Sequence, residues 1–432
     1  MRTIGVLSPR AILILIFVGA LVLRVALVFL LATYRIDPAN NYWAFGYEVG
    51  RVAMSLVSGY GFASPMRIAS GPTAWFTPLF PLILAAIFKI FGVYTVQSAI
   101  ALYAVDSFFS ALTCVLLYWI AKPVFGSGVG LASAALFALY PAAIWHSINT
   151  VWNTSLLACA MVVLVGLLMR AMSDTSYKLF VWAGVTMGVV LLIDPAPAFF
   201  YPFALGLCFW AQKGRPNAIR NVATLALLPA LIFGPWMLRN YLVLGVFTPR
   251  CCSGLEMKLG NNETAWLLGT SIRVGAMHPT SSDAELALYL QMGEVAYDRY
   301  CMAQATQFIR ENPGKFLELS GWRFLGWWFG EVTSWQGHLH TGLPLPQLKR
   351  IAFLLPIPFF LIGAITARRK RPVQMILLLL LTYPVPYYFV HVTERYRFPI
   401  EPFLVLLAVE GLFVALRWFD SLRTQPSLAA TA

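Results

Sequence analysis

Long apolar runs separated by short polar segments dominate the chain. We interpret ten of these runs as membrane-spanning helices, because each approaches the ~20 residues that a helix needs to cross a bilayer. The runs cover approximately residues 11–33, 99–121, 127–147, 154–170, 179–194, 196–212, 221–238, 351–367, 373–391 and 400–417. The pattern predicts an all-α integral membrane protein with about ten transmembrane helices.

Two long segments interrupt the runs and predict helices of a different kind. In residues 34–98, an amphipathic helix is expected over 44–57, and the apolar stretch 78–92 is too short to span the bilayer, which favours a helix lying in the interface. In residues 239–350, Ser282 and Glu285 form a capping-box pattern, which predicts one helix of about 28 residues ending before Pro313.

The pattern predicts three parts in the chain. Residues 1–238 form an N-terminal transmembrane module that includes the outer loop 34–98. Residues 239–350 form a mostly helical extracytoplasmic loop, and residues 351–432 form the C-terminal transmembrane helices and a cytoplasmic tail.

Composition and charge agree with a membrane protein and set its orientation. Of 432 residues, 59% are hydrophobic and 11% are charged, against about 25% charged in a soluble domain. The net charge of +13 does not indicate nucleic-acid binding, because many basic residues fall in short loops on one side of the predicted spans. The positive-inside rule then predicts a multi-pass cell-membrane protein with both termini cytoplasmic and the long loops outside.

The cysteines and carboxylates give no metal-ligand spacing. Cys114, Cys159 and Cys208 lie in apolar runs as packing residues, while a disulfide from Cys301 to Cys251 or Cys252 is an open alternative. If the protein uses a divalent cation, carboxylate and water ligands would suit magnesium or manganese, and no residues are assigned to it.

Polar side chains that gather on the predicted outer side are the candidates for chemistry. Arginine pairs phosphate oxygens through two parallel hydrogen bonds, and a carboxylate can take the proton of an attacking hydroxyl group. Glu48 and Arg51, one helical turn apart, offer both groups on one face, although a plain surface ion pair is the alternative. The other candidates in the outer segments are Asp37, Asn153, Asp194, Arg239, Glu256, Asn261, Asn262, His391, Glu394, Arg395, Tyr396 and Arg397.

The order of several short motifs resembles the GT-C superfamily of membrane glycosyltransferases. The similarity is to bacterial family-39-like enzymes, related to the lipid A aminoarabinose transferases and the protein O-mannosyltransferases. The motifs, in chain order, are "SGYGF", "TPLFPLILAAIFKIFG", "YWIAKPVFG", "ALYPAAIWHS", "PWMLRNYLVLGVF", "LGNNE" and "ERYRFPIEPFL". The chain departs from these relatives at Asn153, where many carry an acid, and at Thr77, where the aminoarabinose transferases carry a lysine.

The resemblance implies a transferase that takes a sugar from a polyprenyl-phosphate carrier and attaches it to a lipid, glycan or protein acceptor at the outer face. It implies Glu48 as the catalytic base, with Asp37 as the alternate. Substrate binding would fall to Arg51, Arg239, Glu256, Asn261, Asn262, Arg395, Tyr396 and Arg397. The alternatives are a transporter or lipid flippase, which should show inverted repeats, and an inactive GT-C-like binding subunit.

Overall fold

The protein is described by a computed structural model covering residues 7–35, 45–149, 151–265, 270–330, 351 and 353–424. These residues are largely helical and contain no β-strand beyond an isolated bridge between Ala63 and Pro72. The helices that form the main bundle are α1 (Pro9–Leu30), α4 (Val96–Phe125), α5 (Ser127–Ala138), α6 (Pro141–Ile148), α7 (Thr154–Ala171), α8 (Tyr177–Ile193), α9 (Tyr201–Gln212), α10 (Ala218–Leu244), α17 (Pro356–Ala367), α18 (Arg371–Thr382) and α21 (Glu401–Thr424).

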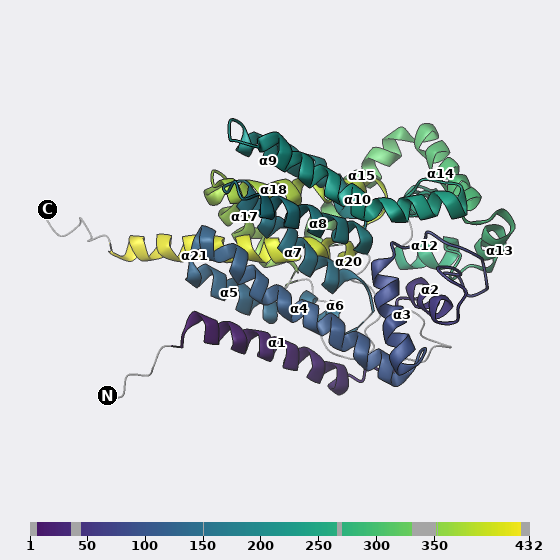
Figure 1. Ribbon diagram of the computed structural model, residues 1–432, viewed down its shortest axis with the longest axis horizontal. Coiled ribbons are helices and arrows are strands. Elements are labelled where there is room, and N and C mark those ends of the chain that lie inside the picture. The colour runs from purple at the N-terminus through teal and green to yellow at the C-terminus, as the bar shows by residue number, and fades with distance from the viewer. Residues whose placement is uncertain are drawn as a thin grey trace.

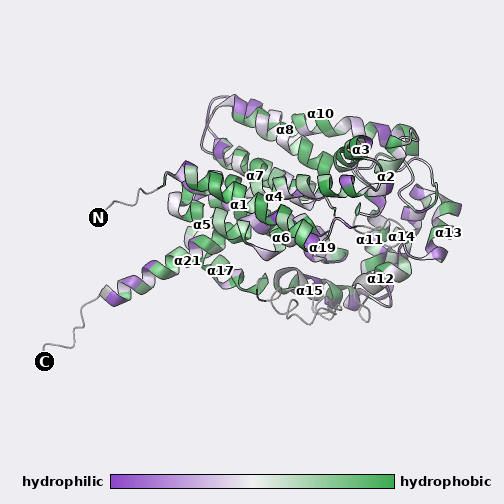
Figure 2. Cartoon of the chain, turned by 90° about the horizontal axis from the view of Figure 1, so that it is seen from below, coloured by the Kyte–Doolittle hydropathy of each residue, from purple (hydrophilic) through white to green (hydrophobic). Residues whose placement is uncertain are grey.

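The long helices lie side by side along the long axis of the molecule, and α1 begins at the same end of the bundle at which α21 ends (Figure 1). The most apolar windows of α7 and of the span Glu394–Arg423, which includes most of α21, are 78% and 72% buried, whereas those of α1 and α10 are only 17% and 22% buried. Leucine, isoleucine and valine therefore remain on the outside of the bundle, where Figure 2 shows apolar helices on the surface. An apolar exterior of this extent fits helices that contact lipid.

The predicted all-α membrane architecture is confirmed, but the count of ten spans is not. Each predicted run overlaps a helix or a pair of helices. Within the described residues, six helices are long and apolar enough to cross a membrane, or seven if the bent pair α5 and α6 counts as one span. The remaining apolar helices, such as α8 and α17, fall short of 18 residues.

A second group of helices covers the opposite end of the bundle, away from the start of α1 and the end of α21 (Figure 1). We define the helical cap as residues 45–76 together with the four described helices of the second long segment that lie between residues 253 and 311. Its helices are α2 (Glu48–Val57), α11 (Ser253–Gly260), α12 (Thr270–Met277), α13 (Asp283–Met292) and α14 (Glu294–Glu311). The neighbouring helices are α3 (Leu79–Phe91), α15 (Pro313–Phe329), α19 (Val385–Phe389) and α20 (Glu394–Arg397), and the short 3-10 helices are η2 (Ala196–Phe199) and η4 (Phe398–Ile400).

The cap has its own small core, which joins two segments that are far apart in the chain. Met66 and Trp75 from the first segment pack with Leu255, Tyr289 and Tyr297 from the second. A buried carboxyl group adds a polar link: Glu294 accepts hydrogen bonds from Thr73 Oγ1, from the backbone N–H of Ala74 at 2.7 Å and from Tyr289 at 3.0 Å. The two segments therefore form one unit.

The prediction of one long helix starting at Ser282 is wrong in one respect. The Ser282 hydroxyl does cap the helix by accepting from the backbone N–H of Glu285 at 3.4 Å. The helix ends at Met292, however, and α14 begins at Glu294, because Gly293 between them adopts φ +77°. A left-handed residue ends a helix, and glycine takes that conformation at little cost.

The cysteines do not form the disulfide that the spacing left open. All six are free and buried. Cys252 and Cys301 belong to the core of the cap, so they act as small apolar packing residues.

Candidate active site

Glu48 is held at the first position of α2, on the side of the cap that faces the bundle. Gly46, two residues before Glu48, has φ +68°, and a Cβ atom there would lie 2.4 Å from the carbonyl oxygen of Val151. Only glycine permits this close approach. Glu48 is 6% exposed, and desolvation of its carboxyl group raises the pKa to about 7. A carboxyl group with that pKa can exchange a proton near neutral pH.

The Glu48 side chain lines a cavity of about 550 Å³ between the cap and the bundle. We call this cavity the outer lobe. Its lining residues come from both parts of the protein: Glu48, Trp75, Phe76, Trp152, Arg250, Glu256, Leu259, Val274, Gly275, His278, Ser281, His391, Thr393, Arg395 and Tyr396. The volume falls in the ordinary range of small-molecule sites.

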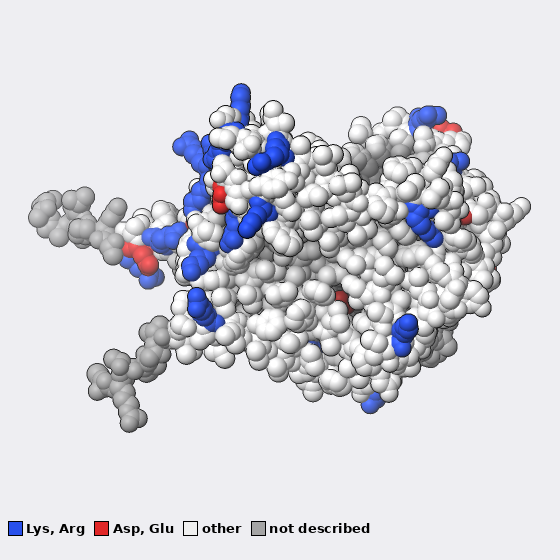
Figure 3. All heavy atoms as spheres, viewed as in Figure 1, with Lys and Arg blue, Asp and Glu red and all other residues white. Residues whose placement is uncertain are grey.

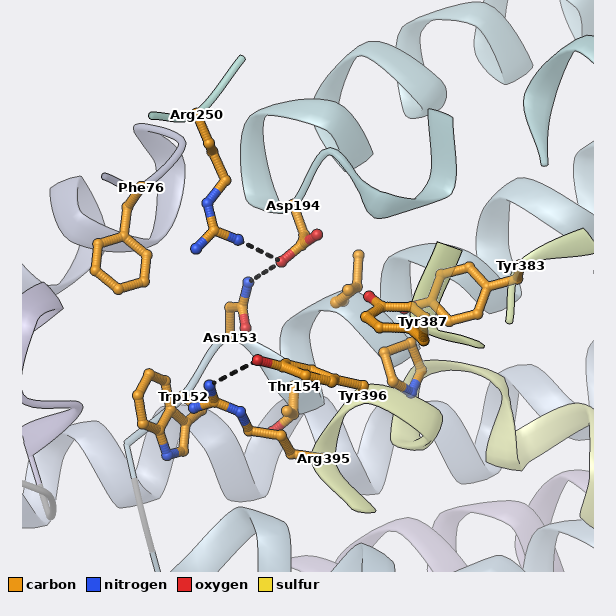
Figure 4. A pocket seen from close by; sticks show the side chains of 12 residues that line it. Phe76, Trp152, Asn153, Thr154, Asp194, Arg250, Tyr383, Tyr387, Arg395 and Tyr396 are labelled. Carbon is orange, nitrogen blue, oxygen red and sulfur yellow. Dashed lines mark hydrogen bonds and ion pairs between the residues drawn. The ribbon is translucent and has the colours of Figure 1, made fainter. Parts of the chain in front are cut away.

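A smaller cavity of about 60 Å³, the inner lobe, lies next to the outer lobe and is shown in Figure 4. The residues that line both lobes are Phe76, Trp152, Arg250, Arg395 and Tyr396. The lobes are thus two parts of one cleft, and two guanidinium groups lie where they meet.

Arg395 presents a charged group to both lobes. Its guanidinium lies 4.1 Å from the centre of the Trp152 ring and 5.0 Å from that of Tyr396, and it donates a hydrogen bond to the Tyr396 hydroxyl at 3.2 Å (Figure 4). Within the described part of the chain, no carboxylate forms an ion pair with it. Stacking on an aromatic ring fixes the plane of the guanidinium and leaves its N–H edge for an anion.

Arg250 belongs to a network that reaches the inner lobe. Its Nε donates to the backbone oxygen of Trp75 at 2.9 Å, and its Nη1 lies 3.7 Å from Oδ2 of Asp194. The same Asp194 oxygen accepts from the amide of Asn153 at 3.3 Å (Figure 4). A carboxylate therefore lies directly beside Asn153, although it comes from the segment between α8 and η2 and not from position 153.

Two histidines approach carboxylates across the outer lobe. Nδ1 of His391 lies 3.0 Å from Oε2 of Glu256, and its Nε2 lies 3.4 Å from the Tyr396 hydroxyl. Nε2 of His278 lies 3.7 Å from Oε1 of Glu48. Glu256 and Tyr396, both expected to bind substrate, therefore line the outer lobe together with Glu48 and Arg395.

The other predicted site residues make contacts outside the lining of the cleft. Arg51 donates to the backbone oxygen of Met66 at 3.2 Å. Arg239 donates to the backbone oxygens of Thr73 at 2.6 Å and Phe62 at 3.0 Å. Arg51 therefore links two parts of the first cap segment, and Arg239 joins α10 of the bundle to that segment.

Arg397 and the two asparagines also have internal partners. Arg397 forms a buried ion pair with Glu401 at 2.7 Å and donates to the backbone oxygen of Trp327 at 3.0 Å. Asn261 donates to the backbone oxygen of Phe389 at 2.9 Å, and Asn262 donates to that of Lys258 at 2.7 Å. Asp37 lies outside the described residues.

The sequence did not single out Arg250, His278 or Trp152. Each lies in a loop or at a helix end without a recognisable motif, and the contacts that bring them to the cleft join distant parts of the chain. Among the described residues, no group of three or more histidine, cysteine, aspartate or glutamate side chains is arranged to hold a metal ion.

Part of the sequence matches a known protein family. Residues 73–238 match the family described as dolichyl-phosphate-mannose-protein mannosyltransferase. A search of the curated proteins finds no match.

Solved structures share the fold. The apo crystal structure of the Archaeoglobus fulgidus oligosaccharyltransferase aligns with a TM-score of 0.53 and 15% identity over 94% of this chain and 52% of that one. The same organism's oligosaccharyltransferase AglB, in complex with an inhibitory peptide and a dolichol-phosphate, aligns with a TM-score of 0.53 and 16% identity over 95% and 52%. The chain thus spans about half the length of these structures. The family match and the shared fold confirm the resemblance of this chain to the GT-C superfamily of membrane glycosyltransferases.

Proposed function

We propose that this protein is a glycosyltransferase that moves a sugar from a polyprenyl-phosphate carrier to a hydroxyl group of a lipid, glycan or protein. One observation carries the proposal: Glu48, Arg250 and Arg395 line a single cavity of about 550 Å³. A carboxyl group and two guanidinium groups supply the base and the anion-binding groups that such a transfer requires.

The charge distribution supports an active site on the extracytoplasmic side. Lysine and arginine side chains gather at the end of the molecule where α1 begins and α21 ends (Figure 3). By the positive-inside rule this end faces the cytoplasm. The cap, several of whose residues line the cleft, lies at the other end (Figure 1).

The relatives support the choice of donor. The matching family is described by its use of dolichyl-phosphate-mannose, and one structure with the same fold contains dolichol-phosphate. Both compounds join a long prenyl chain to a phosphate, and the phosphate is the part that arginine side chains recognise.

The proposed step is a direct displacement with inversion. The acceptor's hydroxyl oxygen attacks the anomeric carbon, and its proton passes to the Glu48 carboxylate. The bond between the anomeric carbon and the phosphate oxygen breaks, and the electron pair stays on the phosphate. Arg395 and Arg250 stabilise the negative charge that grows there. Sugar binding is assigned to Glu256, and its place in the lining of the outer lobe supports this assignment. No step is assigned to a metal ion.

The test uses purified protein in proteoliposomes that contain a polyprenyl-phosphate sugar labelled in the sugar. The measurements are loss of label from the lipid and its appearance in a lipid, glycan or peptide acceptor. We expect Glu48→Gln to lower the transfer rate by about 100-fold or more, because the base is lost. Glu318→Gln, on the exposed surface of α15, is the matched control and should transfer at the wild-type rate.

Each other outcome has a defined meaning. Wild-type protein that neither binds nor consumes the labelled lipid contradicts the proposed function. Binding without transfer to any acceptor indicates an inactive binding subunit, and movement of intact lipid between leaflets indicates a flippase. Wild-type turnover by folded Glu48→Gln contradicts the assignment of the base alone.

A further inference from the structure

His278 faces the Glu48 carboxyl group from the opposite segment of the cap. It follows directly after α12 and is 8% exposed. Its Nε2 lies 3.7 Å from Oε1 of Glu48, and its ring makes an edge-on contact with Trp75, with 5.7 Å between ring centres. The ring is therefore confined on one side by an aromatic surface and directed at the carboxyl group on the other.

The other ring nitrogen shows where the His278 hydrogen lies. The backbone N–H of Thr280 donates to Nδ1 at 3.2 Å, and the Thr280 hydroxyl lies 2.6 Å from the same atom. A nitrogen that accepts a hydrogen bond carries a lone pair, so the hydrogen of the neutral ring is on Nε2. Burial lowers the pKa of His278 to about 4, which keeps the ring neutral at physiological pH.

The loop that carries His278 is fastened to the segment that carries Glu48. The Tyr47 hydroxyl donates to the backbone oxygen of Thr280, and Arg67 forms an ion pair with Asp283. These contacts join residues before and after Glu48 in the first segment to residues that closely follow His278 in the second. They hold the two side chains together although more than 200 positions separate them in the sequence.

We propose that His278 is a positioning residue for Glu48, a role that rests on the proposed function. Its neutral ring donates the Nε2 hydrogen to Oε1 of Glu48, which leaves Oε2 to accept the proton of the acceptor hydroxyl. The 3.7 Å separation is about 0.7 Å longer than a hydrogen bond of ordinary length. Catalytic hydrogen bonds are often long before substrate binds and shorten in the complex.

The contact between His278 and Glu48 should change the pKa of the Glu48 carboxyl group, which can be measured. The Glu48 carboxyl group also interacts with Arg395, Glu256 and Arg250, and His278 interacts with Glu256, His391 and Arg395. A hydrogen bond donated to a carboxylate favours its charged form, whereas burial favours its neutral form. Loss of the His278 hydrogen bond should therefore make Glu48 harder to ionise.

The first experiment measures Glu48 without relying on turnover. Dicyclohexylcarbodiimide modifies protonated buried carboxyl groups, so the modified fraction of Glu48, read by mass spectrometry across a pH series, reports its ionisation. We expect a wild-type midpoint near pH 7 and a midpoint about one pH unit higher in His278→Ala. His278→Gln should restore the wild-type midpoint, because its amide can donate from the position of Nε2. His146→Ala, outside the cleft, is the matched histidine control.

The second experiment follows transfer of the labelled sugar from the polyprenyl-phosphate donor. At neutral pH, His278→Ala should lower kcat by about tenfold with little change in KM, because the donor contacts remain. His278→Gln should recover most of the rate. A purely structural role would lower the amount of folded protein without moving the pH dependence.

Several results overturn the inference. One is a folded His278→Ala protein with the wild-type labelling midpoint and pH profile. If His278→Ala does not fold, His278→Met and His278→Gln are compared, and equal midpoints in these two variants overturn it as well. The labelling measurement needs no turnover, so the inference about His278 can be contradicted even when the wild-type protein transfers sugar. Absence of transfer by the wild-type protein would instead contradict the proposed function.

Discussion

Asp194 and Arg250 form an ion pair at the boundary of the two lobes, with 3.7 Å between Oδ2 and Nη1. The pair joins the segment after α8 to the segment after α10, and Asn153 adds a hydrogen bond to the same carboxylate oxygen. Arg250 is thereby held beside Arg395 in the lining of the cleft. Position 153 itself carries an amide. The carboxylate beside it is that of Asp194, which comes from the segment after α8.

Asp194→Asn tests whether this pair positions Arg250. The substitution keeps the size of the side chain but removes the charge that holds the guanidinium. We expect kcat/KM for the polyprenyl-phosphate sugar to fall by about tenfold, because hydrogen bonds to charged groups contribute roughly 1.5–3 kcal/mol. Initial transfer rates over a range of donor concentrations measure the change. Asp174→Asn, on an exposed loop, should have no effect, and an equal loss in both variants would exclude a specific role for Asp194.

Arg395→Lys separates charge from geometry in the proposed phosphate site. Lysine keeps the positive charge but cannot stack flat on Trp152 or bind an anion through two parallel N–H groups. We expect kcat/KM to fall by about 10- to 100-fold, by the same rate measurements. Arg310→Lys, exposed on α14, is the control. Full activity of Arg395→Lys would show that a point charge is sufficient and that the stacked geometry has no part in transfer.

The pH dependence of transfer follows from Glu48. Burial raises its pKa to about 7, and a base acts only in its deprotonated form. The rate should therefore rise with pH and level off above the pKa, with roughly tenfold between pH 6 and pH 8. Single-turnover rates across this range check the prediction. A rate that falls as pH rises through 7 would indicate that the protonated carboxyl group is the active form.

Gly411→Ala tests the packing of the bundle. Gly363 on α17 and Gly411 on α21 let these helices approach closely, since a Cβ at Gly411 would lie 1.8 Å from the carbonyl oxygen of Phe359. We expect the substitution to destabilise the protein by about 1–3 kcal/mol, because the helices must move apart. Thermal unfolding in detergent measures the change. At Gly234 on α10 a Cβ meets nothing within 4 Å, so Gly234→Ala is the control and should not lower the melting temperature.

The sequence alone determined the class of fold and part of the cleft. Apolar runs and the caps of helices are local patterns, and they located the membrane helices and the helix starting at Asp283. The resemblance also directed attention to Glu48, Glu256, Arg395 and Tyr396, which the structure brings together around one cavity. Their roles there remain proposals.

Only the tertiary structure decided which charged side chains face that cavity. In the sequence, Arg239 and Arg397 are candidates for phosphate binding just as Arg395 is. In the structure, Arg239 donates to a backbone carbonyl and Arg397 pairs with the buried carboxylate of Glu401. Arg250 and His278 carry no motif, and loops from distant parts of the chain bring them to the cleft. The physical reason is that helix formation depends on neighbours within a few residues, whereas the partner of an arginine or histidine depends on how the helices and loops pack.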